Sequence, residues 1–269
     1  GSITIINPLE KIWNGYSDTR MGASMDSYLN GYNDPRLPVY FQPVTDGDNK
    51  GEYRGVANGM PNPQQDDYKV MSAPNVQEKS TDSPLRWMMA SEVAFLRAEG
   101  AMRAWTAEMG GTAEEFYNKG IELSFLENGL SADAAARYAA DETSKPTDFT
   151  DVSAANTKYN ISALGKITIK WNAGASEEEQ LERIITQKWI AMFPNGTEAW
   201  SEFRRTGYPR LFPVRYNYPS SGVDTNKQIR RMVFPQSEYS NNGAAVQEAV
   251  KLLGGPDNGG TKLWWDKKN

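Results

Sequence analysis

Residues 181–213, LERIITQKWIAMFPNGTEAWSEFRRTGYPRLFP, constrain the fold more than any other stretch of the chain. Apolar residues recur at helical spacing in its first half and predict one buried helix face. Ser176 with Glu179 three residues later makes a capping box for the start of that helix. Pro194 cannot continue a helix, and Asn195–Gly196 is typical of a tight turn. The pattern therefore predicts a helix that ends at a sharp corner.

A second helix follows the corner, so that residues 176–207 form a helical pair. We expect Thr197 to cap this helix and the helix to bury Trp200 and Phe203. Gly207 suits the left-handed residue that ends a helix, and Pro209 prevents its continuation. Aromatic side chains at helical spacing are usually core residues, so packing is the favoured interpretation of this cluster.

Residues 84–129 predict a helical hairpin. A repeat of seven residues alternates large and small side chains and lets a partner helix approach closely (Met88, Ser91, Phe95, Ala98, Met102 and Trp105). We expect Gly110–Gly111 to end the first helix and Thr112 with Glu115 to cap the second. The second helix is expected to point Phe116, Ile121 and Leu123 inward and to close at Gly129.

The remaining segments predict short elements and long loops. Residues 1–82 are rich in Pro, Gly, Asn and Asp and read as a loop-rich, candidate ligand-binding region. Within and after it we expect a helix at 19–31, an edge strand or extended crossing at 35–41, a helix at 131–140, a half-buried strand at 166–171 and a C-terminal helix at 243–253. The fold class is therefore mainly α, as one domain over 1–269 with little β structure.

Several long phrases resemble the SusD/RagB family of surface nutrient-binding lipoproteins from Bacteroidetes. They are WNGYSDTRMGASMDSYLNGYNDPRLPVYF at 13–41, WMMASEVAFLRAEGAMRAW at 87–105, ITQKWIAMFPNGTEAWSEFRRTGYPRLFP at 185–213, IRRMVFPQSEYSNN at 229–242 and GGPDNGGTKLWWDK at 254–267. The resemblance implies a SusD-like helical fold in which 84–129 is a tetratricopeptide-like unit. It also implies glycan binding at the cell surface, for import through a SusC-type TonB-dependent outer-membrane porin. Family members are nearly twice as long, so we expect this chain to be a C-terminal part whose lipid anchor lies outside it.

Composition excludes several classes of function. The chain has no histidine and no cysteine, so a Ser-His-Asp triad, a Cys-His dyad and a typical zinc site are impossible. A net charge of -5 argues against nucleic acid as a partner. No glycine-rich phosphate loop is present, because the GGPDNGG run at 254–260 lacks the Lys-Ser/Thr pair. We expect no cofactor, no metal and no catalysis.

A glycan site needs exposed aromatic rings for stacking and fixed polar groups for the hydroxyls. The loop-rich region supplies both, and the six residues that we single out are Trp13, Tyr16, Asp18, Arg20, Tyr53 and Arg54. The resemblance transfers no individual binding residue, so this choice depends on composition and position. The competing interpretation is that the aromatic residues anchor irregular loops onto the helices.

Two other functions remain open. The chain can be a scaffold that binds peptides or the porin, or a glycoside hydrolase that uses paired carboxylates. The Glu114–Glu115 and Glu177–Glu179 runs favour solvated helix starts instead, and Asp66–Asp67 a solvated loop. The arginine pairs 204–205 and 230–231 favour structural pairing with Glu198, Glu202 or Asp224 over an anion clamp. Asp46, Asp48, Asn49 and Glu52 form only a weak calcium-like pattern.

Overall fold

The computed structural model describes residues 9, 11–60, 65–75, 86–105 and 109–268. Its helices are η1 (Lys11–Gly15), α2 (Ala23–Gly31), α3 (Leu37–Tyr40), α4 (Gln65–Tyr68), α5 (Ala90–Met102), α6 (Ala113–Glu127), α7 (Ala132–Ala139), η4 (Ala154–Tyr159), α8 (Glu177–Ala191), α9 (Gly196–Thr206), η5 (Pro219–Ser221) and α10 (Gln236–Leu252). Within these residues β pairing is limited to three isolated bridges. The predicted mainly α fold is confirmed.

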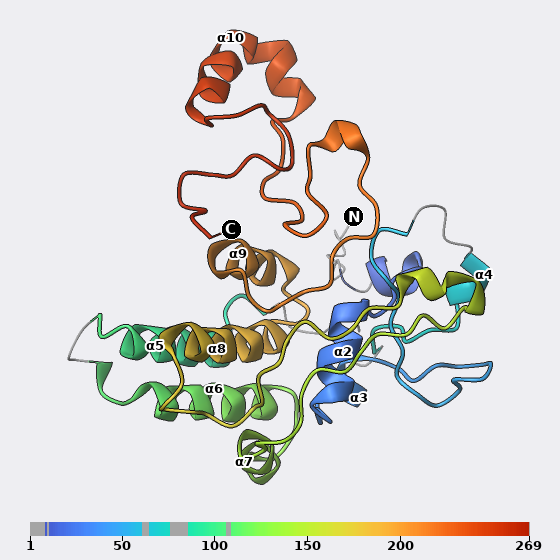
Figure 1. Cartoon of the computed structure of the whole chain (residues 1–269), viewed down its shortest axis with the longest axis vertical. Coiled ribbons are helices and arrows are strands. Elements are labelled where there is room, and N and C mark those ends of the chain that lie inside the picture. Colours follow the sequence, from blue (N-terminus) through green and yellow to red (C-terminus); the bar gives the residue numbers. More distant parts are fainter. Residues whose placement is uncertain (1–8, 10, 61–64, 76–85, 106–108, 269) are drawn as a thin grey trace, which may run out of the picture.

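The main core lies where α5, α6 and α8 pack together (Figure 1). Phe95 of α5, Ile121 and Phe125 of α6, and Ile184 of α8 are fully buried there. Gly120 allows the hairpin to close, because a Cβ atom at this position would lie 2.6 Å from the ring of Phe95. Helix α9 lies on the opposite side of α8 from α6, and α7 packs under α6.

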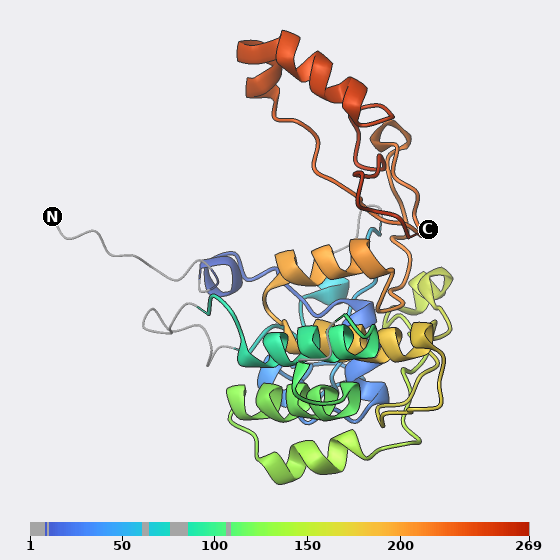
Figure 2. The same ribbon diagram turned by 90° about the vertical axis from the view of Figure 1, so that its left-hand side faces the viewer.

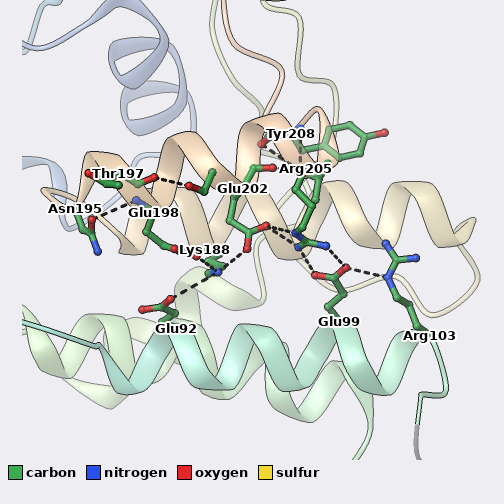
Figure 3. A network of polar contacts seen from close by, with 12 residues as sticks. Glu92, Glu99, Arg103, Lys188, Asn195, Thr197, Glu198, Glu202, Arg205 and Tyr208 are labelled. Carbon is green, nitrogen blue, oxygen red and sulfur yellow. Dashed lines mark hydrogen bonds and ion pairs between the residues drawn. The ribbon is translucent and has the colours of Figure 1, made fainter. Parts of the chain in front are cut away.

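A network of ion pairs links α5, α8 and α9 (Figure 3). The ammonium of Lys188 is only 1% exposed and lies 2.8 Å from carboxylate oxygens of both Glu198 and Glu202. Arg205 donates to Glu99 and to Glu202, at 2.6 Å each. Burial tends to raise the pKa of Glu99, but hydrogen bonds from Arg205 and Arg103 outweigh it and lower the pKa below its ordinary value. Buried charges need such partners, so this network sets where α9 lies on the core.

Local signals in the sequence set most helix ends. Thr112 and Glu115 form the predicted capping box. Of the capping box predicted at Ser176 only one half forms, because the Ser176 side chain accepts from the backbone N–H of Glu179 but, within the described residues, the Glu179 carboxylate accepts no return bond from the backbone N–H of Ser176. Gly207 and Gly129 are left-handed, with φ of 77° and 74°. The cap of α9 is Asn195 and not Thr197, because the helix begins at Gly196. These ends hold the two helices at the predicted corner.

The prediction that Gly110–Gly111 ends α5 is wrong. The helix ends at Met102, where Ala104 adopts a left-handed φ of 51° and the backbone N–H of Trp105 returns to the carbonyl of Gly100. Met88 and Trp105, the first and last residues of the predicted seven-residue repeat, therefore lie outside the helix, and both are exposed. Phe116 and Ile121 are buried as expected, whereas Leu123 is half-buried.

Residues 35–41 and 166–171 are not strands. Pro38 is tolerated in the first turn of the short helix α3, so the first segment turns instead of extending. In the second segment Ile167, Ile169 and Trp171 are buried on alternate positions, as predicted. However, the hydroxyls of Tyr32 and Tyr117 donate to the carbonyls of Ile167 and Ile169 in place of a neighbouring strand.

The C-terminal helix α10 projects from the body on two connecting segments (Figures 1 and 2). It begins at Gln236, earlier than predicted, and Asn242 breaks its helical geometry. Of the predicted apolar face only Val246 is buried. No helix of the described residues combines the length and the apolar character needed to cross a bilayer.

Candidate functional site

Among the predicted site residues, Trp13 makes a defined ring contact. It lies in η1 and stacks on Phe193 just after α8, with ring centroids 6.0 Å apart and planes within 7°. Phe193 is itself held by the rings of Tyr40 and Phe41, at 4.8 and 5.0 Å. Trp13 stays partly exposed, so its indole is an anchored ring at the edge of the core.

A pocket of about 240 Å³ opens beside this ring, and we call it the aromatic pocket. Its walls combine aromatic and apolar side chains with hydroxyl, amide and guanidinium groups: Trp13, Thr19, Arg20, Met21, Gly22, Ser24, Met25, Phe41, Asn58, Pro74, Trp189, Phe193, Leu211, Phe212 and Gln228. A few polar groups in a mostly apolar wall are typical of small-ligand pockets. Trp189 comes from α8, Ser24 from α2 and Gln228 from the segment before α10.

Arg20 lines the aromatic pocket but uses its donors on backbone carbonyls. Its guanidinium bonds the carbonyls of Ser17 and Thr19 at 3.0 and 2.8 Å, and Nε bonds that of Lys69 at 3.2 Å. Burial lowers the pKa of Arg20, and the nearby Asp18 opposes this shift. Arg20 therefore ties η1 and its loop to the body, and it forms a fixed part of the pocket wall.

The other four predicted residues do not line the aromatic pocket. Tyr16 is 65% exposed on the loop after η1, and Asp18 is also exposed. Tyr53 packs against the main core. Arg54 pairs with Asp26 at 3.8 Å and donates to the carbonyl of Thr150 at 2.7 Å. The binding role of all six residues remains a prediction.

Sequence reasoning missed two aromatic residues of this pocket. Trp189 and Phe193 belong to the aromatic cluster of residues 181–213, for which core packing is the favoured interpretation, yet both also line the aromatic pocket. Their place next to the Pro194 corner was the available signal, because a helix end brings side chains to the surface. Asn58 and Gln228 carry no comparable signal, since they are single polar residues in loops.

A second and larger pocket of about 890 Å³ lies at the N-terminal end of α8, and we call it the charged pocket. Its walls bring together basic, acidic and a few apolar side chains from segments far apart in the sequence: Leu164, Lys166, Ile167, Ser176, Glu178, Glu179, Glu182, Phe203, Gly207, Tyr208, Arg210, Leu211, Asn226, Lys227, Arg230 and Lys268. Its aromatic rings, Phe203 and Tyr208, are buried, so neither offers an open face for stacking.

The acidic clusters of the sequence are explained by helix starts and ion pairs. Glu114–Glu115 and Glu177–Glu179 lie in the first turns of α6 and α8. Asp66 lies in α4 and not in the predicted loop, and a hydrogen bond from Lys69 lowers its pKa. Across the described residues no three acidic side chains converge on a position that could hold a metal ion. The weak calcium-like pattern therefore has no support from this geometry.

The arginine pairs separate onto different partners. Arg205 joins Glu99 and Glu202, whereas Arg204 lies over the ring of Trp200 at 3.5 Å. Arg230 pairs with Asp266 at 2.7 Å and Arg231 with Asp257. The predicted partners Glu198 and Asp224 are wrong, because Glu198 binds Lys188 and Asp224 accepts the backbone N–H groups of Asn226 and Lys227.

Comparison with known proteins identifies the family. Residues 1–266 match the family described as "SusD-like: Susd and RagB outer membrane lipoprotein". The chain belongs to the SusD-like family. This membership places the protein at the outer membrane, at the cell surface. A search of curated proteins found no significant match.

Solved SusD homologues share the architecture over nearly the whole chain. A chitin-binding SusD homologue from Flavobacterium johnsoniae is 42% identical with a TM-score of 0.90, covering 100% of this chain and 54% of its own. A SusD-like protein from Bacteroides thetaiotaomicron is 43% identical with a TM-score of 0.89, covering 98% and 54%. A homologue from Bacteroides vulgatus is 38% identical with a TM-score of 0.90, covering 98% and 52%. The chain thus spans about half the length of these relatives.

Proposed function

We propose that this SusD-like chain binds a glycan at the cell surface without turning it over, and that the aromatic pocket is part of the binding site. The observation that carries the proposal is the indole of Trp13, which stacks on Phe193 and lines a mostly apolar pocket that also carries a few polar groups. An indole face packs against the C–H groups of a sugar ring, and neighbouring amides take its hydroxyls.

One solved relative supports a sugar as the ligand. The Flavobacterium johnsoniae homologue is described as chitin-binding. Chitin oligosaccharides are therefore the first probes for this chain, followed by other neutral oligosaccharides. The absence of histidine and cysteine in the sequence is compatible with a binding role.

The bound glycan would pass to a SusC-type TonB-dependent porin, with the present protein acting as its lid. The family's location at the outer membrane supports this partner. Release to a porin requires modest affinity, so we expect dissociation constants in the micromolar range or weaker. Co-purification of the intact lipoprotein from outer membranes tests the association.

Titration of the chain with chitohexaose by calorimetry tests the site. We expect Trp13→Ala to weaken binding about tenfold or more, because stacking and buried apolar area are lost together. Trp264→Ala is the matched control, since Trp264 is 82% exposed and lies outside the aromatic pocket. Equal losses of affinity in the two variants, or no loss of affinity in Trp13→Ala, would show that Trp13 is not part of the binding site.

Two outcomes would favour a function other than non-catalytic glycan binding. Release of shorter sugars during long incubation would favour a carboxylate-based hydrolase. If no neutral glycan binds while the chain retains peptide binding or porin association, the protein is a scaffold.

A further inference from the structure

Arg210 lies at the wall of the charged pocket, where two neighbours hold it in one orientation. Its Nε atom lies 3.4 Å from both carboxylate oxygens of Glu182, a side chain that is only 8% exposed. The guanidinium carbon lies over the ring of Tyr208 at 5.2 Å. A buried carboxylate and an aromatic face therefore fix the guanidinium from two sides.

The outer end of Arg210 is available to a ligand. Neither of its terminal nitrogens has a hydrogen-bond partner among the described residues, and its side chain is 51% exposed. These two nitrogens carry four N–H donors in one plane, which is the geometry that binds a carboxylate or a sulfate group with two parallel hydrogen bonds.

The other cations of the charged pocket fall into two groups. Lys268 pairs with Glu178, and Arg230 pairs with Asp266, so both are neutralised locally. Lys166 and Lys227 also line the pocket, and within the described part of the chain neither ammonium makes an ion pair. Three positively charged groups with free donors therefore surround one cavity, from segments that are 17 or more residues apart in the sequence.

The size and walls of the cavity indicate the rest of the ligand. A volume of about 890 Å³ is in the range of ligand pockets, which span about 300–1,000 Å³. Ser176, Glu179 and Asn226 add hydroxyl, carboxylate and amide groups that suit sugar hydroxyls. Because no aromatic face is open here, recognition must depend on charge and hydrogen bonds.

We propose that the charged pocket is a second glycan site, selective for acidic oligosaccharides, in which Arg210 grips a carboxylate or sulfate group and Lys166 and Lys227 add charge. Glu182 acts as a positioning residue, because it touches Arg210 and not the ligand. The proposal does not require the aromatic pocket to bind a sugar, so either site can fail alone.

Calorimetric titration with trigalacturonic acid, its neutral methyl ester and a sulfated chondroitin disaccharide tests the proposal. We expect at least one acidic probe to bind, with an affinity that falls as salt is raised, and we expect the methyl ester to bind at least about tenfold more weakly than trigalacturonic acid if the latter binds. Binding of trigalacturonic acid would show that a carboxylate is sufficient, whereas binding of only the chondroitin disaccharide, which carries a carboxylate as well, would show that the site requires the sulfate.

Substitutions locate the binding. Arg210→Gln should weaken binding of the acidic probe about tenfold or more. Arg210→Lys should restore part of the affinity, because lysine keeps the positive charge but lacks the planar pair of N–H donor groups of the guanidinium. Arg137→Gln on the exposed face of α7 is the matched control. Trp13→Ala should leave acidic binding unchanged, whereas it should weaken neutral glycans.

Three results would overturn the proposal. They are equal affinity for the acid and its ester, absence of binding by both acidic probes at millimolar concentration, and unchanged affinity in an Arg210→Gln variant whose melting curve matches that of the parent chain.

Discussion

The two pockets of this chain differ in how their walls are fixed. In the aromatic pocket aromatic side chains pack against one another, since Phe193 contacts the rings of Trp13, Tyr40 and Phe41. In the charged pocket carboxylates hold cations, and about half of the wall is titratable side chains. Ring packing depends little on salt and pH, whereas ion pairs depend on both. The two pockets share one helix, because α8 contributes Trp189 to the aromatic pocket and Glu182 to the charged pocket. We therefore expect binding in the aromatic pocket to be insensitive to charge and binding in the charged pocket to depend on it.

The largest expected effect comes from breaking the framework that both pockets share. In Lys188→Met the carboxylates of Glu198 and Glu202 lose their buried cation (Figure 3). Removing one partner of a buried ion pair typically costs about 3–5 kcal/mol. We expect a large drop in melting temperature and loss of both binding activities. A small change in unfolding free energy, measured in urea, would mean that the network contributes little to the position of α9.

A smaller effect should separate the pockets. Phe193→Ala removes the ring on which Trp13 stacks, and truncating this half-buried side chain should cost about 1–3 kcal/mol of stability. We expect weaker neutral-glycan binding and unchanged acidic-glycan binding, measured by calorimetry on the same sample. Equal weakening of both ligands would show that the pockets are coupled through α8.

A change in pH should alter ligand affinity at the charged pocket and not at the aromatic pocket. Burial raises the pKa of Glu182 above its ordinary value of 4.5, whereas a hydrogen bond from Lys268 lowers the pKa of Glu178. As the pH falls, Glu182 takes up its proton first and no longer holds Arg210 by charge. Affinity for the sulfated probe, whose sulfate group stays charged, should therefore decrease a few-fold as the pH falls through the raised pKa of Glu182.

The sign of the linked stability change separates this effect from unfolding. Because the pKa of Glu182 is higher in the folded chain than in the unfolded chain, its protonation stabilises the fold as the pH falls through the folded pKa. Binding should thus weaken while this group adds stability. Glu182→Gln should give a flat affinity profile over the same pH range, and a profile unchanged from the parent would exclude Glu182 as the titrating group.

The smallest effect is expected for an ion pair that belongs to neither pocket. Lys251 and Glu248 of α10 pair at 2.6 Å with side chains that are 69% and 72% exposed. Exposed pairs contribute about 0–1 kcal/mol. Lys251→Ala should leave melting temperature and both affinities within error, and it serves as the baseline for the other variants.

Local patterns predicted much of the helical framework. The capping box at Thr112, the cap at Ser176 and the left-handed Gly207 are each set by a few adjacent residues, so they could be read from the sequence. One error arose where distant groups supplied the hydrogen bonds. The segment 166–171 has the alternation of a strand, but the Tyr32 and Tyr117 hydroxyls, from elsewhere in the chain, satisfy its carbonyls.

The sequence by itself determined most of the long helices, several of their ends, the family and the chemistry that is excluded by the lack of histidine and cysteine. Tertiary structure alone decided which side chains meet. Trp13 and Phe193 are 180 residues apart in the sequence and stack, and Arg210, which follows α9, meets Glu182 of α8. Helix caps depend on neighbours along the chain, whereas a pocket depends on the packing of whole helices, which no local spacing encodes.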